Sequence, residues 1–442
     1  MHLLKSLRQS NRDIRILWTS VFLRMAGYGL TNQVLTLYLE SLGISEPNIG
    51  IFMTLTLIGD TVISYFLTWY ADQIGRRRVM MLGTLMMYGS GMVFAFSSHF
   101  VVLLLAAIFG VISPSGDETG PFKSVEEASI AHLTPENHRP EIYAFYGLFA
   151  TAGAALGSLL CGLLVDYMNL QLDYDLERCY RIIFLVYAFF AFLKFSLMLF
   201  LTPKCEIYFD AEREEELTEE AALLGETIPE LETAPEDYFG LSERTRHLLP
   251  RLLAIFMLDS LGYGFMPSAW VVYYLKKTFL TTATGLGILF FITNSVDSIS
   301  ALPSAYLSKA LGPVKAILFT QAPSGAFFLV IAFFNNFKLV AFFLILYYTT
   351  STMDVVPRQV LLTSIMPREE ITKVMGIVNI GKTFARCIGP IFTGKLAAGN
   401  NLRFGFVING GCVLLADLIL ATNFLHIDAE IRQKESRDQD IT

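Results

Sequence analysis

The chain has 442 residues, of which 53% are hydrophobic and only 17% are charged, and its formal net charge is −7. Soluble proteins average roughly 25% charged residues, so this composition excludes an ordinary soluble domain and indicates a membrane protein. Five cysteines without CxxC spacing predict neither a metal site nor a disulfide framework. We expect no cofactor and no nucleic-acid partner.

Apolar stretches long enough to cross a bilayer, which takes about 20 residues, occur twelve times. They lie near residues 15–40, 47–71, 78–97, 100–132, 141–168, 180–202, 248–275, 284–308, 314–334, 339–365, 371–397 and 403–425. Residues 204–247 are rich in Glu and too poor in apolar side chains to order by themselves. We therefore predict an N-terminal six-helix bundle (1–203), an acidic cytosolic loop (204–247), a C-terminal bundle (248–426) and a cytosolic tail (427–442).

Lys and Arg that flank spans predict the orientation, because these residues favour the cytosolic side. Basic residues precede the first span and follow the second, and these are Lys5, Arg8, Arg12, Arg15, Arg76, Arg77 and Arg78. An even number of spans places both termini on that side. We expect an integral multi-pass protein with cytosolic termini, in the plasma membrane or an internal membrane such as the vacuole.

The two halves of the chain resemble each other. "AGYGLTNQVLTLYLES" (26–41) matches "LGYGFMPSAWVVYYLKK" (261–277), and two further matches align Asp60 with Asp297 and Gly157 with Gly389. Two six-span repeats in the same orientation are typical of transporters in which two bundles move around a site at their interface.

The stretch "ADQIGRRR" (71–78) resembles the loop between the second and third spans of the major facilitator superfamily, G-x-x-x-D-(R/K)-x-G-R-(R/K). The matching residues are Asp72, Gly75, Arg76 and Arg77, whereas Thr68 and Gln73 depart from the pattern. The resemblance implies an all-α fold of 12 transmembrane helices in two pseudo-symmetric bundles. It also implies that the four matching residues form a latch that holds one conformation. The segments SPSG…GPF (113–122) and MDVVPRQ (353–359) are similar to those of a less studied branch.

Ionisable residues inside spans mark transport pathways or ion pairs. The repeat aligns Arg24 with Asp259 and Glu126 with Arg358, so we predict acid–base pairs between the two halves. The alternative is that these are static pairs that only fix helices together.

The complete set of candidate residues for a proton or substrate site is Arg24, Asp60, Asp117, Glu118, Glu126, Asp259, Asp297, Asp354, Arg358, Lys382 and Arg386. Asp60 and Asp297 could instead form hydrogen bonds to a neighbouring Thr61 or Ser298. Lys194, near the end of the sixth span, is expected to extend toward the membrane surface.

The leading functional prediction is a monomeric, proton-coupled secondary active transporter that moves a small molecule or ion across a lipid bilayer by alternating access. A non-transporting receptor or scaffold with the same fold, or an uncoupled facilitator, remains the alternative. We do not expect an enzyme, because the sequence contains no Ser-His-Asp set, phosphate-binding glycine loop or metal-ligand cluster.

Overall fold

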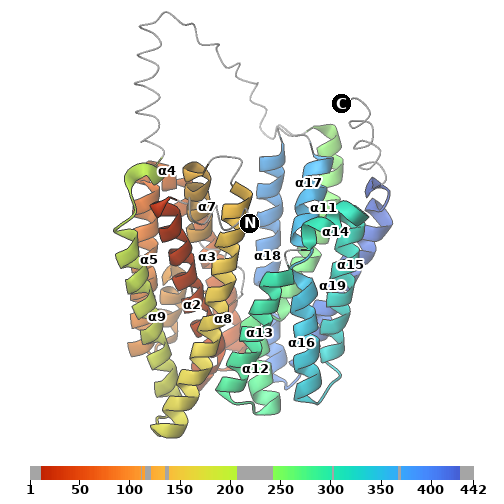
Figure 1. Ribbon diagram of the computed structural model, residues 1–442. Coiled ribbons are helices and arrows are strands. Elements are labelled where there is room, and N and C mark those ends of the chain that lie inside the picture. The colour runs from red at the N-terminus through yellow and green to blue at the C-terminus, as the bar shows by residue number, and fades with distance from the viewer. Residues whose placement is uncertain are drawn as a thin grey trace, which may run out of the picture.

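Two helical bundles lie side by side in the computed structural model, which describes residues 11–110, 112–114, 121–134, 139–206, 242–300, 303–366 and 370–428 (Figure 1). The N-terminal half contains α2 (Arg12–Ser41), α3 (Glu46–Trp69), α4 (Ala71–Ile74), α5 (Arg76–Phe96), α6 (Phe100–Gly110), α7 (Pro121–Leu133), α8 (Arg139–Gln171), α9 (Leu176–Met198) and a 3-10 turn (Pro203–Cys205). The C-terminal half contains α11 (Glu243–Phe265), α12 (Ser268–Phe279), α13 (Ala283–Ser300), α14 (Ser304–Leu311), α15 (Pro313–Ile331), α16 (Phe337–Ser351), α17 (Val355–Ile365), α18 (Ile371–Ala398) and α19 (Arg403–Phe424). No strand occurs in these described ranges.

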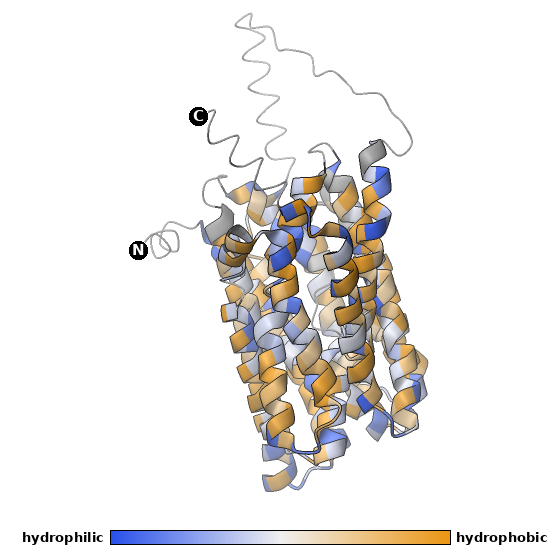
Figure 2. Ribbon diagram, turned by 90° about the vertical axis from the view of Figure 1, so that its right-hand side faces the viewer, coloured by the Kyte–Doolittle hydropathy of each residue, from blue (hydrophilic) through white to orange (hydrophobic). Residues whose placement is uncertain are grey.

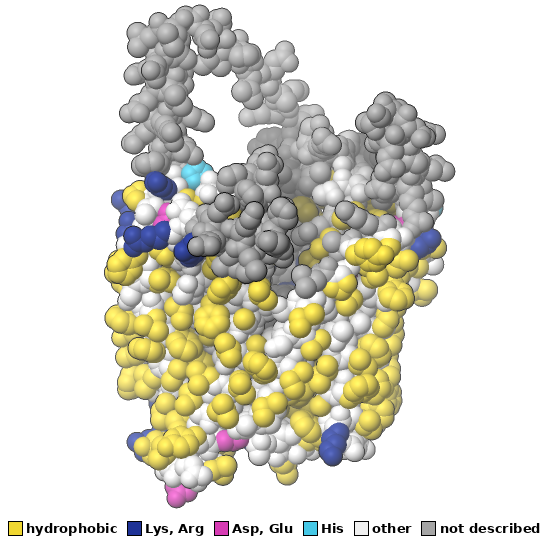
Figure 3. Space-filling view, in the orientation of Figure 1, with side chains coloured by type: hydrophobic (Ala, Val, Ile, Leu, Met, Phe, Trp, Pro, Cys, Tyr) yellow, Lys and Arg dark blue, Asp and Glu magenta, His cyan; other side chains and the backbone are white. Residues whose placement is uncertain are grey.

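The helices follow the predicted spans closely. Within the part of the chain that the structure describes, eight helical segments are long and apolar enough to cross a membrane. The remaining four of the twelve spans are formed by α2, α6 with α7, α13 with α14, and α18. Hydrophobic residues predominate along the helices that face the viewer in Figure 2, and apolar side chains cover the middle of the face shown in Figure 3, with charged side chains toward its two ends.

Four of the predicted spans consist of two helices each: α6/α7, α11/α12, α13/α14 and α16/α17. Proline stands at or next to three of these breaks, because α7 begins at Pro121, Pro267 precedes α12 and Pro303 precedes α14. A proline lacks the N–H that would continue the helix. Such breaks free backbone polar groups inside a membrane protein, where protein or a water-filled cavity must satisfy them.

The two halves approach most closely where α3 packs on α18 and α8 packs on α13. A Cβ atom added at Gly50 would lie 2.4 Å from the backbone oxygen of Pro390, and one at Gly162 would lie 2.4 Å from that of Ala283. Larger residues would not fit at these positions, so glycine permits the backbones of the two halves to touch.

We call the end of the molecule where α2 begins and α19 ends the termini end, and the opposite end, where α12 lies, the far end (Figure 1). At the far end Lys277 forms an ion pair with Glu40, and the Tyr273 hydroxyl lies 3.1 Å from Glu40 Oε1. Asp166 of α8 accepts hydrogen bonds from the backbone N–H groups of Ala283 and Thr284 at 3.2 and 2.7 Å. Polar contacts therefore join the halves at the far end.

Candidate functional site

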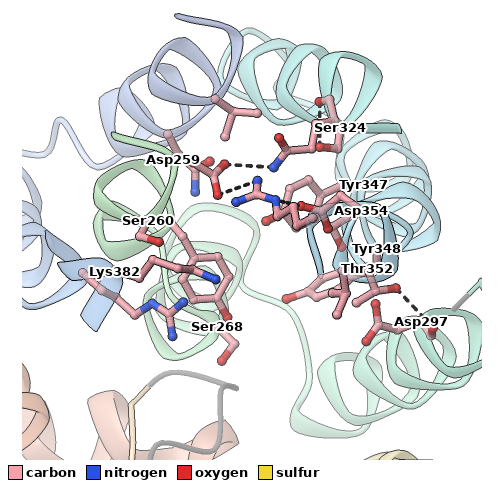
Figure 4. Close-up of a pocket in the computed structure, with 18 of the residues that line it drawn as sticks. Asp259, Ser260, Ser268, Asp297, Ser324, Tyr347, Tyr348, Thr352, Asp354 and Lys382 are labelled. Carbon is pink, nitrogen blue, oxygen red and sulfur yellow. Dashed lines mark hydrogen bonds and ion pairs between the residues drawn. The ribbon is translucent and has the colours of Figure 1, made fainter. Parts of the chain in front are cut away.

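A cavity of about 490 Å³ lies between the two halves (Figure 4). The N-terminal half contributes neutral residues to its lining, which are Met25, Tyr28, Asn32, Thr151, Ala154 and Ser158. The C-terminal half contributes the charged ones, which are Asp259, Asp297, Asp354, Arg358, Lys382 and Arg386. Among the described residues, the charge of this cavity thus comes from one half.

Arg358, on the first turn of α17, is the centre of the charged wall. Its Nη2 atom lies 2.9 Å from Oδ2 of Asp259 on α11, and its Nε atom lies 2.5 Å from Oδ2 of Asp354 one turn earlier. The Asp259 carboxylate also accepts a hydrogen bond of 3.0 Å from Nε2 of Gln321 on α15. The Arg358 guanidinium lies 5.1 Å from the ring centre of Phe256, a cation–π distance. Arg358 therefore links α17 to α11, and Asp259 in turn links α11 to α15.

Two further cations of the cavity belong to α18. Arg386 lies over the ring of Tyr263, with its Cζ atom 4.8 Å from the ring centre, and Lys382 is one turn away on the same helix. In Figure 4, Lys382 and Asp297 lie on different sides of the cavity. The cavity thus offers positive and negative groups at separate places on its wall.

The N-terminal half holds its own buried cluster, centred on Glu126 of α7. The Glu126 carboxylate contacts Arg24 at 2.8 Å and Lys194 at 3.1 Å, and it accepts hydrogen bonds from Tyr146 at 2.7 Å and Ser20 at 2.9 Å. Glu126 and Lys194 are both 0% exposed. These residues lie on α2, α7, α8 and α9, so the cluster fastens four helices of this half together.

The predicted ion pairs between the halves are wrong. Arg24 pairs with Glu126 and Arg358 pairs with Asp259, so each pair lies within one half. The repeat relates equivalent positions by a rotation of one half onto the other, which does not bring those positions into contact. Arg24 and Glu126, both predicted as candidate residues for the proton or substrate site, do not line the cavity.

Asp60 is 0% exposed on α3 and accepts a hydrogen bond of 3.4 Å from Ser64, outside the lining of the cavity. Its neighbour Thr61 donates instead to the backbone oxygen of Leu57. Ser298, the predicted partner of Asp297, pairs with Thr151 across the halves at 2.8 Å. Asp117 and Glu118 lie outside the described residues.

The predicted latch contacts the end of its own half. Gly75 has a φ of 100°, and the backbone N–H groups of Arg76 and Arg77 at the start of α5 donate to Glu206 at 2.7 and 3.1 Å. The Arg76 guanidinium donates to the backbone oxygen of Ala128 at 3.1 Å. The side chain of Asp72 lies outside the described residues.

The second half repeats this arrangement. Gly312 has a φ of 89°, and the N–H groups of Val314 and Lys315 at the start of α15 each donate to Asp428 at 2.9 Å. A carboxylate at a helix N-terminus satisfies free N–H groups and interacts favourably with the helix dipole. Our sequence reasoning missed Glu206 and Asp428, although each follows the last span of its half.

Two buried residues of the charged clusters were also missed or misplaced. Lys194 does not extend to the membrane surface but points to Glu126 inside the bundle. Asp417 of α19 is 4% exposed and interacts electrostatically with Asp259, Asp354 and Arg358. Asp417 stands in "LLADLIL", where a single acid in an apolar run was the available signal.

Two repeated helical halves around a central polar cavity define a membrane transport protein. The family model of the Major Facilitator Superfamily matches residues 17–258 and 252–440, and the chain belongs to this superfamily. The chain is 52% identical over 437 residues to the uncharacterized membrane protein YJR124C of Saccharomyces cerevisiae, covering 97% of each chain.

Solved structures share the fold. A bacterial homologue of the human lysosomal transporter Spinster, in an inward-facing and occupied conformation, is similar with a TM-score of 0.71 and 11% identity, covering 94% of this chain and 98% of that chain. A D-xylose–proton symporter is similar with a TM-score of 0.67 and 16% identity, covering 92% and 95%.

Proposed function

We propose that this protein is a proton-coupled secondary active transporter that carries a small polar solute by alternating access. The observation that carries the proposal is the cavity of about 490 Å³ between two repeated halves, with a charged wall in the C-terminal half. A volume of this size suits a small molecule. We further propose that the termini end faces the cytosol, since Arg76, Arg77 and Arg78 lie there.

Alternating access requires the far end to open and close. The contacts that join the halves there are suited to this, because Lys277 is 51% and Glu40 27% exposed at their side chains. Partly exposed ion pairs contribute about 0–1 kcal/mol, so breaking them costs little. Because these contacts join the halves at the far end, we infer that a solute enters the cavity from the termini end.

Recognition of the solute involves the two cations of α18 in our proposal. Lys382 and Arg386 are one turn apart and both line the cavity, which suits an anionic group on the solute. The carboxylates of Asp259, Asp297 and Asp354 also line the cavity, and we propose that they take part in binding a cationic group or a proton.

A flux assay with purified protein in liposomes tests the proposal. Sugars, phosphate, metal ions and cationic drugs would be screened for uptake with and without a pH gradient, and a protonophore would then remove the gradient. We expect uptake of one class to fall when the gradient is removed. Unchanged uptake would leave an uncoupled facilitator, and no uptake of any class would favour a receptor or scaffold.

Two variants test whether the cavity is the site of transport in this assay. We expect Arg386→Gln to reduce uptake at least tenfold, equivalent to about 1.4 kcal/mol of lost binding. Lys395→Gln is the matched control, because Lys395 lies on the same helix but over Phe392, outside the cavity lining. Equal loss in both variants would contradict a role for the cavity.

A further inference from the structure

The buried charge clusters of the two halves have opposite composition. In the N-terminal half one carboxylate, Glu126, is contacted by two cations, Arg24 and Lys194. In the C-terminal half one guanidinium, Arg358, contacts the carboxylates of Asp259 and Asp354, and the buried carboxylate of Asp417 acts on it electrostatically. The two clusters also correspond in position, because Lys194 lies on α9 and Asp417 lies on α19, the last long helix of each half.

Asp417 is the member of the C-terminal cluster that lies behind the cavity wall. Asn409 and Val413 of α19 line the cavity, and Asp417 follows one turn after Val413 without being part of the lining. Its side chain is buried, and among the described residues its Oδ2 atom has no hydrogen-bond partner. A buried carboxylate oxygen without a donor is costly in an apolar environment.

The charged groups that act electrostatically on Asp417 are two acids and one cation. Helix α11 contributes Asp259, and α17 contributes Asp354 together with the cation Arg358. From α18, Lys382 interacts with Asp354, and from α15 the neutral Gln321 binds Asp259. The cavity lining contains three acidic and three basic residues, whose charges balance. An ionised Asp417 therefore adds one negative charge that no basic residue of the lining balances.

Binding of a proton removes this excess. Carboxylates that share a buried site cannot all ionise without strong mutual repulsion, and such a group holds a proton between its members. We propose that Asp417 and its neighbours around Arg358 form a proton-binding site, with Oδ2 of Asp417 as the atom that takes up the proton. This inference deepens the proton coupling proposed above and rests on it.

The chemical step is a simple proton transfer. A hydronium ion in the cavity gives its proton to Oδ2 and becomes water, and the carboxylate of Asp417 becomes a neutral carboxylic acid; the reverse transfer returns the proton to water. While Asp417 is neutral, Arg358 stays with Asp259 and Asp354. When the proton leaves, the new negative charge competes for the guanidinium and weakens the bond to Asp259. The proton thereby changes the link between α17 and α11, two helices that border the cavity.

The cluster of the N-terminal half gives the contrasting case. Glu126 is contacted by two cations and accepts hydrogen bonds from Tyr146 and Ser20, so its negative charge is already compensated. We assign to it a fixed structural role and no exchange of protons in the cycle.

Proton binding is measurable without knowing the solute. Detergent-purified protein would be titrated in unbuffered solution between about pH 5 and pH 9, and we expect Asp417→Asn to bind roughly one proton fewer than the wild type. Infrared difference spectra over the same range should show the carbonyl band of a protonated carboxylic acid in the wild type, and this band should be absent in Asp417→Asn.

Asp166→Asn is the matched control, because Asp166 is an aspartate of the far end that binds backbone N–H groups away from this cluster. It should retain the wild-type proton count and band. Asp417→Glu, which keeps a carboxyl group, should retain the band if the Asn variant does not fold. A wild type without a titrating band, or an Asp417→Asn variant that keeps it, would overturn the proposal.

Flux measurements separate this inference from the proposed function. In liposomes that take up a solute identified in the screen, Asp417→Asn should exchange that solute across the membrane but lose accumulation driven by a pH gradient. If the wild type shows the band but no pH-driven uptake, the proton site stands and the proposed coupling fails. If uptake is coupled and Asp417→Asn remains fully coupled, the assignment to Asp417 fails.

Discussion

Replacing Glu126 by glutamine is the sharpest test of the N-terminal cluster. The substitution keeps the shape of the side chain but removes the negative charge that lies 2.8 Å from Arg24 and 3.1 Å from Lys194. Removing one partner of a buried ion pair costs about 3–5 kcal/mol, because the remaining charge stays buried. The amide oxygen of glutamine can still accept from Tyr146 or Ser20, which offsets roughly 1 kcal/mol. We therefore expect a loss of about 2–4 kcal/mol in the free energy of unfolding.

Unfolding can be followed in detergent with a thiol-reactive dye, because Cys161, Cys179, Cys205 and Cys387 are buried in the folded protein. The double variant Glu126→Gln, Lys194→Met should be more stable than Glu126→Gln alone, since it removes one of the two cations that lost their counterion. A Glu126→Gln variant within about 0.5 kcal/mol of the wild type would refute the reasoning, because surface substitutions produce changes of that size.

Three further predictions concern the far end and the termini end. A Cβ at Gly394 would lie 2.5 Å from a backbone oxygen of the other half, so Gly394→Val should prevent closure of the far end and abolish uptake in liposomes while the protein still elutes as a folded particle. Glu206→Gln and Asp428→Asn each remove a carboxylate that caps a helix and should lower stability by about 1 kcal/mol in the same unfolding assay. Glu40→Gln removes the partly exposed pair with Lys277 and should change stability by less than about 1 kcal/mol, while thiol reagents added at the far end should label a cysteine introduced in the cavity faster.

The sequence was sufficient to predict the helices because the bilayer imposes one rule on all of them. Long apolar runs must form helices there, since no water satisfies the backbone. The predicted span at 371–397 is α18 (Ile371–Ala398), and the one at 403–425 is α19 (Arg403–Phe424). The breaks in the helices were also foreseeable in part, because Pro121 marks the start of α7.

The partners of the charged residues were not predictable in the same way. Which side chains meet depends on the rotation of each helix about its axis and on which helices are neighbours, and a single sequence contains neither. Arg24 was correctly placed inside a span, but its neighbour α7 and hence Glu126 followed only from the packing. The repeat suggested equivalence between the halves, which is a statement about symmetry and not about contact.

The ion pairs of each half have a consequence for biosynthesis. Arg24 and Arg358 each bind a carboxylate of their own half, so neither half depends on the other to compensate its buried cations. We therefore expect the N-terminal half to be able to fold in the membrane before the second half is translated. If the chain is divided between residues 206 and 242 and the two halves are expressed as separate polypeptides, we expect them to assemble in the membrane into a protein that takes up the solute.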